Sequence, residues 1–159
     1  MTFQVFNPSV SSLATGIGTI GTPDRVTDAV CPVLTWSHSV VSQSAGVFTI
    51  PQGYKAVLMH GLYVETTTSG PNLQLSTRWY NDSASAYIGC ASNTAVTTSG
   101  ASTLLRVPCA MAMVDASAAS VQVTLRAFAW SATNVPLSLV GSRVDYLGDS
   151  WVSIMTVLA

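Results

Sequence analysis

The feature that most constrains this chain is an alternation of apolar and polar side chains with a period of two residues. In PNLQLSTRWY (residues 71–80), Leu73, Leu75, Thr77 and Trp79 share one face, and the residues between them form the other. The segment SVQVTLRAFAW (120–130) repeats the pattern. A strand with one buried face has this period, whereas an amphipathic helix has a period of 3.6. These segments therefore predict β-strands.

Two other segments, 54–65 (YKAVLMHGLYVE) and 151–158 (WVSIMTVL), are apolar on both faces. Strands with this composition are buried on both sides. We expect one side of each to face the core and the other to contact another subunit.

Stretches rich in Gly, Pro, Ser, Asn and Asp separate the strand-like segments at fairly regular intervals. About eight short strands with such breaks predict an all-β sandwich or barrel. The one run of good helix formers, 101–119, is interrupted by Pro108, so no helix is expected.

The first thirty residues have no sustained period and are rich in Gly, Ser, Thr and Pro. We therefore divide the chain into an extended N-terminal arm (1–30) and a β-domain (31–159). The arm contains a literal G-x-G-x-x-G at Gly16, Gly18 and Gly21. A dinucleotide site needs a helix directly after the glycines and an acid about twenty residues further on. Since the chain offers neither, we expect no bound cofactor.

Charge is scarce: the chain has six Lys and Arg, seven Asp and Glu, and a net charge of −1. Nucleic-acid binding needs a cluster of basic residues, which the sequence lacks. Nor is there an apolar run of membrane-spanning length, or a basic and apolar leader at the N-terminus. We expect a protein made in a cytoplasm. Its sparsely charged surface favours cover by copies of itself or by a larger assembly.

Residues for catalysis or metal binding are few. The two histidines are His38 and His60, no G-x-S-x-G occurs, and His60 lies in a doubly apolar strand, as a core or interface histidine would. Asp145 and Asp149 bracket the last turn, where turn formation and a loop calcium site are both open readings. We predict no enzyme, no resident metal and no small-molecule substrate.

The cysteines Cys31, Cys90 and Cys109 form no CxxC motif. We expect buried, reduced thiols, although one pair could meet across two strands.

The segment GVFTIPQGYKAVLMHGLYVE resembles the signature hairpin of the complement-globular/tumour-necrosis-factor (C1q/TNF) superfamily, with Gly46, Phe48, Pro51, Gly53 and Tyr54 as matching residues. The end of the chain, DSWVSIMTVLA, resembles the closing strand of that fold, which lies beside the first strand. The resemblance implies a jelly-roll sandwich of about eight to ten antiparallel strands that assembles as a homotrimer.

The two doubly apolar strands would then form the inner sheet. The trimer contact would be made by Tyr54, Leu58, His60, Leu62, Trp151, Ile154 and Val157.

A trimeric jelly roll with an arm and no evident chemistry also resembles the decoration (cement) proteins of tailed-bacteriophage capsids. This resemblance implies a virion protein on the outer surface of the head, at three-fold or quasi-three-fold positions, whose arms tie neighbouring major capsid proteins together. The arm contacts would be Phe3, Val5, Phe6, Leu13, Ile17, Ile20 and Arg25. The alternative is a receptor-binding knob of a viral tail or fibre that recognises host glycans through loop aromatics.

Overall fold

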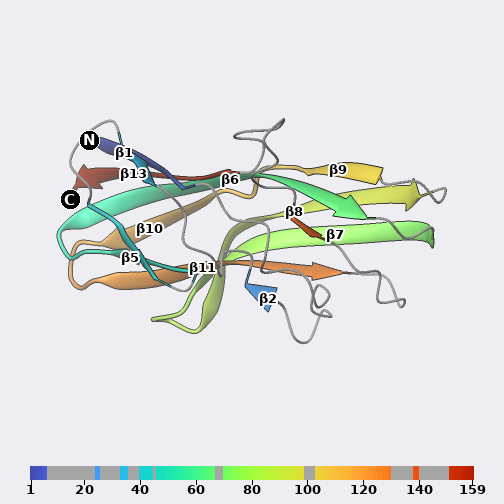
Figure 1. Cartoon of the computed structure of the whole chain (residues 1–159). Coiled ribbons are helices and arrows are strands. Elements are labelled where there is room, and N and C mark those ends of the chain that lie inside the picture. The colour runs from blue at the N-terminus through green and yellow to red at the C-terminus, as the bar shows by residue number, and fades with distance from the viewer. Residues whose placement is uncertain are drawn as a thin grey trace.

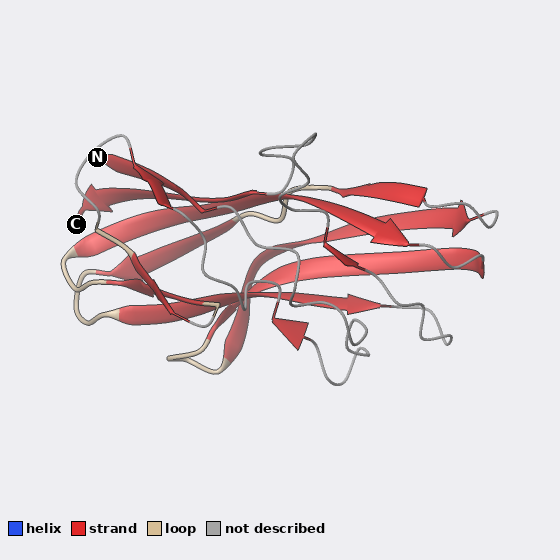
Figure 2. Ribbon diagram, in the orientation of Figure 1, coloured by secondary structure: helices blue, strands red, loops and turns tan. Residues whose placement is uncertain are grey.

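The computed structural model describes residues 1–6, 24–25, 33–35, 40–44, 46–66, 70–98, 103–129, 138–139 and 151–159. Across these ranges the chain forms strands and turns and no helix (Figure 2). It follows that this described part contains no helix long and apolar enough to span a membrane.

The strands form two antiparallel sheets, which are seen as two layers in Figure 1. The larger sheet has the order β10-β6-β13-β1-β3, with β9 and β12 also paired to β6. Its strands are β1 (Thr2–Phe6), β3 (Val33–Thr35), β6 (Tyr54–Thr66), β9 (Thr103–Val107), β10 (Ala112–Ala116), β12 (Ser138–Leu139) and β13 (Trp151–Leu158).

The smaller sheet has the order β4-β5-β11-β7-β8, with β2 also paired to β11. Its strands are β2 (Asp24–Arg25), β4 (Ser42–Ser44), β5 (Val47–Ile50), β7 (Gly70–Asn81), β8 (Ala86–Thr98) and β11 (Val121–Ala129). Nine of the thirteen described strands have four or more residues. The expected all-β sandwich of eight to ten main strands is confirmed.

The two doubly apolar segments are neighbours in the larger sheet. They form β6 and β13, which pair from Trp151↔Gly61 to Leu158↔Tyr54. The closing strand β13 also pairs with β1, as the resemblance implied, and the two ends of the chain lie close together in Figure 1. The expectation that these segments share a sheet is confirmed.

The core lies between the sheets and is centred on Trp79. This side chain is fully buried, and Phe48 contacts it edge-on at a centroid distance of 6.1 Å. The Nε1–H of Trp79 donates a hydrogen bond to the Ala110 carbonyl at 3.0 Å, so the one polar group of the indole is satisfied. The alternating segments supply the surrounding residues as expected, since Thr77, Val123 and Leu125 are also fully buried.

The segment that resembles a hairpin is a corner between the two sheets. The strand β5 pairs with β4 and β11 in one sheet, whereas β6 belongs to the other. At Gly53 the backbone turns with φ of +88°, a conformation that favours glycine. Its N–H donates to the Ala116 carbonyl, and its own carbonyl accepts from Ala159. The chain therefore turns at Gly53, but β5 and β6 do not pair with each other as the two strands of a hairpin would.

The expected arm is not separate from the domain at its start. Residues 2–6 form β1, which pairs with β13 on one side and β3 on the other. The side chain of Gln4 is fully buried, and its Oε1 accepts hydrogen bonds from the N–H groups of Val40 and Val41 at 3.0 and 2.7 Å. Its Nε2 donates to the Val41 carbonyl at 3.1 Å. The first six residues are therefore part of the β-domain, which corrects the boundary at residue 30.

Gly89 lies at a crossing of β8 with the start of β10, where the two backbones are close. Its φ is +66°, and an added Cβ would lie 2.0 Å from the Met111 carbonyl oxygen. We predict that Gly89→Ala lowers the free energy of unfolding by on the order of 3 kcal/mol, because strain and a backbone clash add. Urea denaturation measures this value.

Gly53→Ala is the matched control. Its φ is also positive, but nothing lies within 4 Å of the added Cβ, so only the backbone strain of about 1 kcal/mol is expected. Equal losses for the two variants would contradict the proposed crossing.

Candidate functional site

The outer face of the larger sheet carries an unusual concentration of apolar side chains. Alternate residues of β6 face inward, so that Ala56 and Leu58 are buried while Lys55 is exposed and Val57 is half-buried. Directly opposed residues of neighbouring strands share a face. The register therefore places Met113, Val57 and Met155 in one row across β10, β6 and β13, and Asp115, Lys55 and Val157 in the next.

These two rows line a hollow of about 390 Å³. Met113 is 80% exposed and Val157 is 39% exposed, so the hollow is open to solvent in the single chain. Exposed apolar surface of this kind is characteristic of interaction sites, and methionine adapts well to a partner's shape. We call the face formed by these six residues the methionine face.

One ion pair lies on the methionine face. Lys55 Nζ is 3.5 Å from Asp115 Oδ2, and both side chains are more than half exposed, so the pair adds little stability. Hydrogen bonds from Ser117 lower the pKa of Asp115, and Lys55 acts in the same direction. Asp115 is therefore charged at neutral pH and is available to pair with groups on a partner.

Three of the residues expected at the trimer contact face the wrong way for that role. Leu58, His60 and Ile154 are fully buried in the core of one chain, where a sister copy could not touch them. Both faces of these strands are apolar, so the sequence did not reveal which face is inward. Val157 does lie on the methionine face, and Tyr54 is half-buried against the core. Leu62 and Trp151 are placed on β6 and β13 by their backbone, and their side chains lie outside the described residues.

Some of the residues expected in the arm lie in strands, and the others lie outside the described residues. Phe3, Val5 and Phe6 belong to β1 and Arg25 to β2, so their backbones are paired within the sheets. Leu13, Ile17 and Ile20 lie outside the described residues, as do the glycines of the G-x-G-x-x-G match.

Inside the core, His60 joins strands from both sheets. Its Nε2 accepts a hydrogen bond from the Ala110 N–H at 3.0 Å and lies 2.8 Å from Thr77 Oγ1, which in turn contacts Ser92 Oγ. Within the described part, Nδ1 has no hydrogen-bond partner. Burial lowers the pKa of His60 to about 4. The structure thus places His60 in the core and leaves it neutral at physiological pH.

The described cysteines differ from expectation. Cys90 and Cys109 are exposed free thiols rather than buried ones, and Cys31 lies outside the described residues. Asp145 and Asp149 also lie outside them. In the described ranges no group of three or more His, Cys, Asp or Glu side chains is close enough to hold a metal ion.

A second cluster, on the smaller sheet, was not found from the sequence. The guanidinium of Arg126 lies over the ring of Tyr80, 3.6 Å from its centroid, and Tyr80 contacts Tyr87 edge-on at 5.0 Å. Arg78 lies over Tyr87 at 5.6 Å. We call these four residues the arginine–tyrosine ladder. The residues come from three strands, and only their register brings them together.

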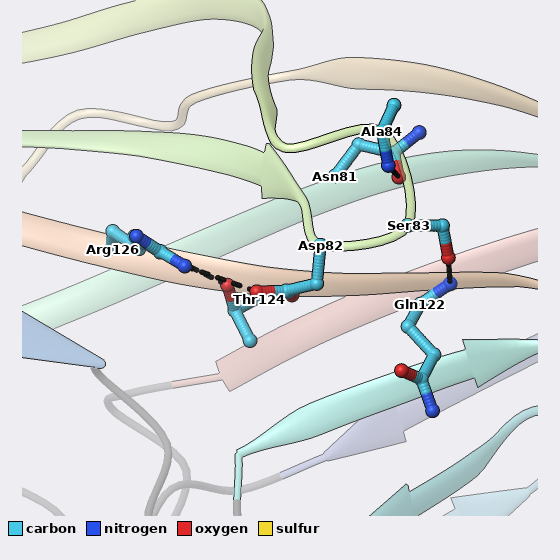
Figure 3. Close-up of polar contacts among 7 residues, drawn as sticks. All are labelled: Asn81, Asp82, Ser83, Ala84, Gln122, Thr124 and Arg126. Atoms are coloured by element: carbon cyan, nitrogen blue, oxygen red, sulfur yellow. Dashed lines mark hydrogen bonds and ion pairs between the residues drawn. The ribbon is translucent and has the colours of Figure 1, made fainter.

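Arg126 is held in place from two further sides. Its Nη2 donates to Asp82 Oδ1 at 3.0 Å and its Nε to Thr124 Oγ1 at 3.3 Å (Figure 3). Asp82 begins the turn between β7 and β8, and the same turn is fixed to β11 by the Ser83 hydroxyl, which accepts from the Gln122 N–H. These hydrogen bonds hold Arg126, and with it the ladder, against the turn between β7 and β8.

The comparisons with known proteins agree with the architecture. No family model matches the chain, and no curated protein matches its sequence. Among solved structures, the chain is similar to the Eiger TNF of S. frugiperda, with a TM-score of 0.54 and 11% identity over 99% of this chain and 92% of that chain.

The buried histidine generates a prediction about pH. The folded-state pKa of His60 is below its ordinary value of 6.5, so between pH 6.5 and 4 the unfolded chain binds a proton that the folded chain does not. Stability attributable to His60 is therefore present above pH 6.5 and is lost as pH falls, by about 3 kcal/mol at pH 4. Urea denaturation at several pH values measures this loss.

His60→Gln is the comparison variant, because the amide oxygen can still accept from Ala110 but does not titrate in this range. The difference in stability between wild type and variant should shrink as pH falls from 7 to 4. A difference that is constant with pH would contradict the burial of a neutral His60.

The two-sheet topology and this structural neighbour together establish the fold as an all-β, TNF-like jelly-roll sandwich.

Proposed function

We propose that the protein is a structural virion component, a homotrimer that decorates the outer surface of a bacteriophage head and has no catalytic role. The observation that carries the proposal is the methionine face on a jelly roll of the C1q/TNF type. An apolar face of this extent on a chain with few charges favours cover by identical copies.

The geometry of the larger sheet supports the proposed trimer. Met113, Val57 and Met155 cross three adjacent strands in register, so a continuous apolar row is presented to a neighbour. Three copies around an axis can each place this band against the next, and stable contacts of this type bury about 1,600 Å² or more. Lys55 and Asp115, one row away, would fix the register between copies.

The attachment to the shell is proposed for the segment between β1 and β2. Both strands are paired within the domain, and residues 7–23 connect them along the chain. Three such segments on one trimer bind with a high effective concentration, so that modest contacts by each suffice. Neighbouring major capsid proteins would be the partners.

Antibody labelling of virions tests the location. Gold-conjugated antibodies raised against the chain are expected on the outer surface of the head in electron micrographs. Labelling of tail fibres would support the glycan-binding knob instead, and the absence of the chain from virions would refute both.

The trimer contact generates a prediction about Met113. Because this side chain is 80% exposed, Met113→Glu should change the stability of the single chain by only about 0.5 kcal/mol. In a trimer the added carboxylate would be buried without a partner, which is strongly unfavourable. Light scattering at micromolar concentration should give three chains for wild type and one for the variant.

Ala86→Glu is the matched control, since it adds the same charge at an exposed position of β8 in the other sheet. It should remain a trimer. A trimeric Met113→Glu variant would contradict the proposed contact.

The attachment segment generates a prediction of its own. Deleting the whole N-terminus would remove β1 and the buried Gln4, so residues 7–23 should instead be replaced by a Gly-Ser linker of equal length. We expect a trimer that no longer co-sediments with capsids stripped of the protein. Unchanged co-sedimentation would contradict the role of this segment.

A further inference from the structure

Half of the basic residues of the chain occupy one row of the smaller sheet. Arg126 on β11 is opposed by Arg78 on β7 and by Arg25 on β2. The chain has only six basic residues and a net charge of −1, so this row is a local concentration of positive charge. The one carboxylate paired with it in the described part is Asp82, on Arg126.

The structure describes the side chains of two arginines of the row, Arg126 and Arg78, and these differ in their roles. Arg126 is only 20% exposed in its side chain and is engaged by Asp82, Thr124 and the Tyr80 ring, so it is a positioning residue. Arg78 lies at the outer end of the ladder and has no carboxylate within ion-pair distance in the described ranges. Its Nη2 donates to the Gly89 carbonyl at 3.1 Å. A guanidinium has five N–H donors, so Arg78 retains the capacity to bind an anion.

The ring contacts of the ladder indicate the chemistry of the ligand. Sugars bind to aromatic residues by stacking on ring faces, but one face of Tyr80 is covered by Arg126 and one face of Tyr87 by Arg78. Arg78 is half-buried and its Nε is enclosed, so its Nη groups are the donors that can reach a ligand. Tyr87 beside it is 38% exposed. Planar guanidinium groups bind carboxylates through paired hydrogen bonds, which makes a carboxylate the best-matched group.

We propose that the ladder is a binding site for an acidic segment of a protein partner, with Arg78 binding a side-chain carboxylate and Tyr87 contacting the adjacent chain. The site is on the opposite sheet from the methionine face, so a trimer formed through that face leaves it accessible. The binding of a carboxylate by the ladder does not depend on the proposed function. Only the further step of taking the acidic partner to be a capsid shell protein rests on the proposed function.

Calorimetric titration of the full-length protein with a hexaglutamate peptide tests the site. We expect saturable binding that weakens with added salt, and Arg78→Gln should weaken it about tenfold through loss of a charge-assisted contact. The affinity of the Arg78→Lys variant should lie between those of wild type and Arg78→Gln, because lysine keeps the charge but not the paired hydrogen bonds. Arg106→Gln, which removes the same charge from β9 of the larger sheet, is the matched control and should bind as wild type does.

Several results would overturn the proposal. These are no binding of hexaglutamate, an equal loss for Arg106→Gln, or binding of sialyllactose or a DNA oligonucleotide in place of the peptide. Circular dichroism of each variant establishes that a loss of binding is not a loss of fold. Light scattering of the same samples measures the oligomeric state independently of binding. A monomeric protein that binds hexaglutamate would refute the proposed trimer but not the binding site.

Discussion

The pairing of β6 with β13 is the constraint on which the rest of the structure depends. These two strands lie side by side at the centre of the larger sheet, and each is apolar on both faces. Their inner faces supply Leu58 and Ile154 to the core, while their outer faces leave Val57 and Met155 on the methionine face. One strand pair thus creates both the core and a second apolar surface that favours a partner.

The core and the two outer faces of the molecule differ in chemistry. Between the sheets, Trp79 and His60 both form hydrogen bonds to the backbone of Ala110, which lies just before β10 and links the two layers. Outside one sheet is the methionine face, and outside the other is the arginine–tyrosine ladder. A trimer that buries the first and presents the second would have one face for self-assembly and one for a different protein. This arrangement would suit the proposed decoration protein, which closes on itself and attaches to a shell.

Much of the fold was predictable because one-sided strands reveal their buried face. The alternation around Trp79 and Leu125 gave both the strands and the direction of their side chains. The same reasoning failed for β6 and β13, where both faces are apolar, so that Leu58, His60 and Ile154 were assigned to the outer contact. Gln4 was missed for another reason: its local sequence is typical of an arm, and only residues 36 and 37 positions away make it part of the core. The ladder depends on a register among distant strands that no local pattern encodes.

Oxidation of methionines by dilute hydrogen peroxide, followed residue by residue by mass spectrometry, tests the central claim most directly. In the single chain Met113 is 80% exposed and Met1 is 86% exposed, so the two thioethers should react at similar rates if the chain is alone. Cover of the methionine face by sister copies predicts that Met113 of the purified protein is oxidised many times more slowly than Met1. Equal rates would show that the face is open to water and would contradict the assembly.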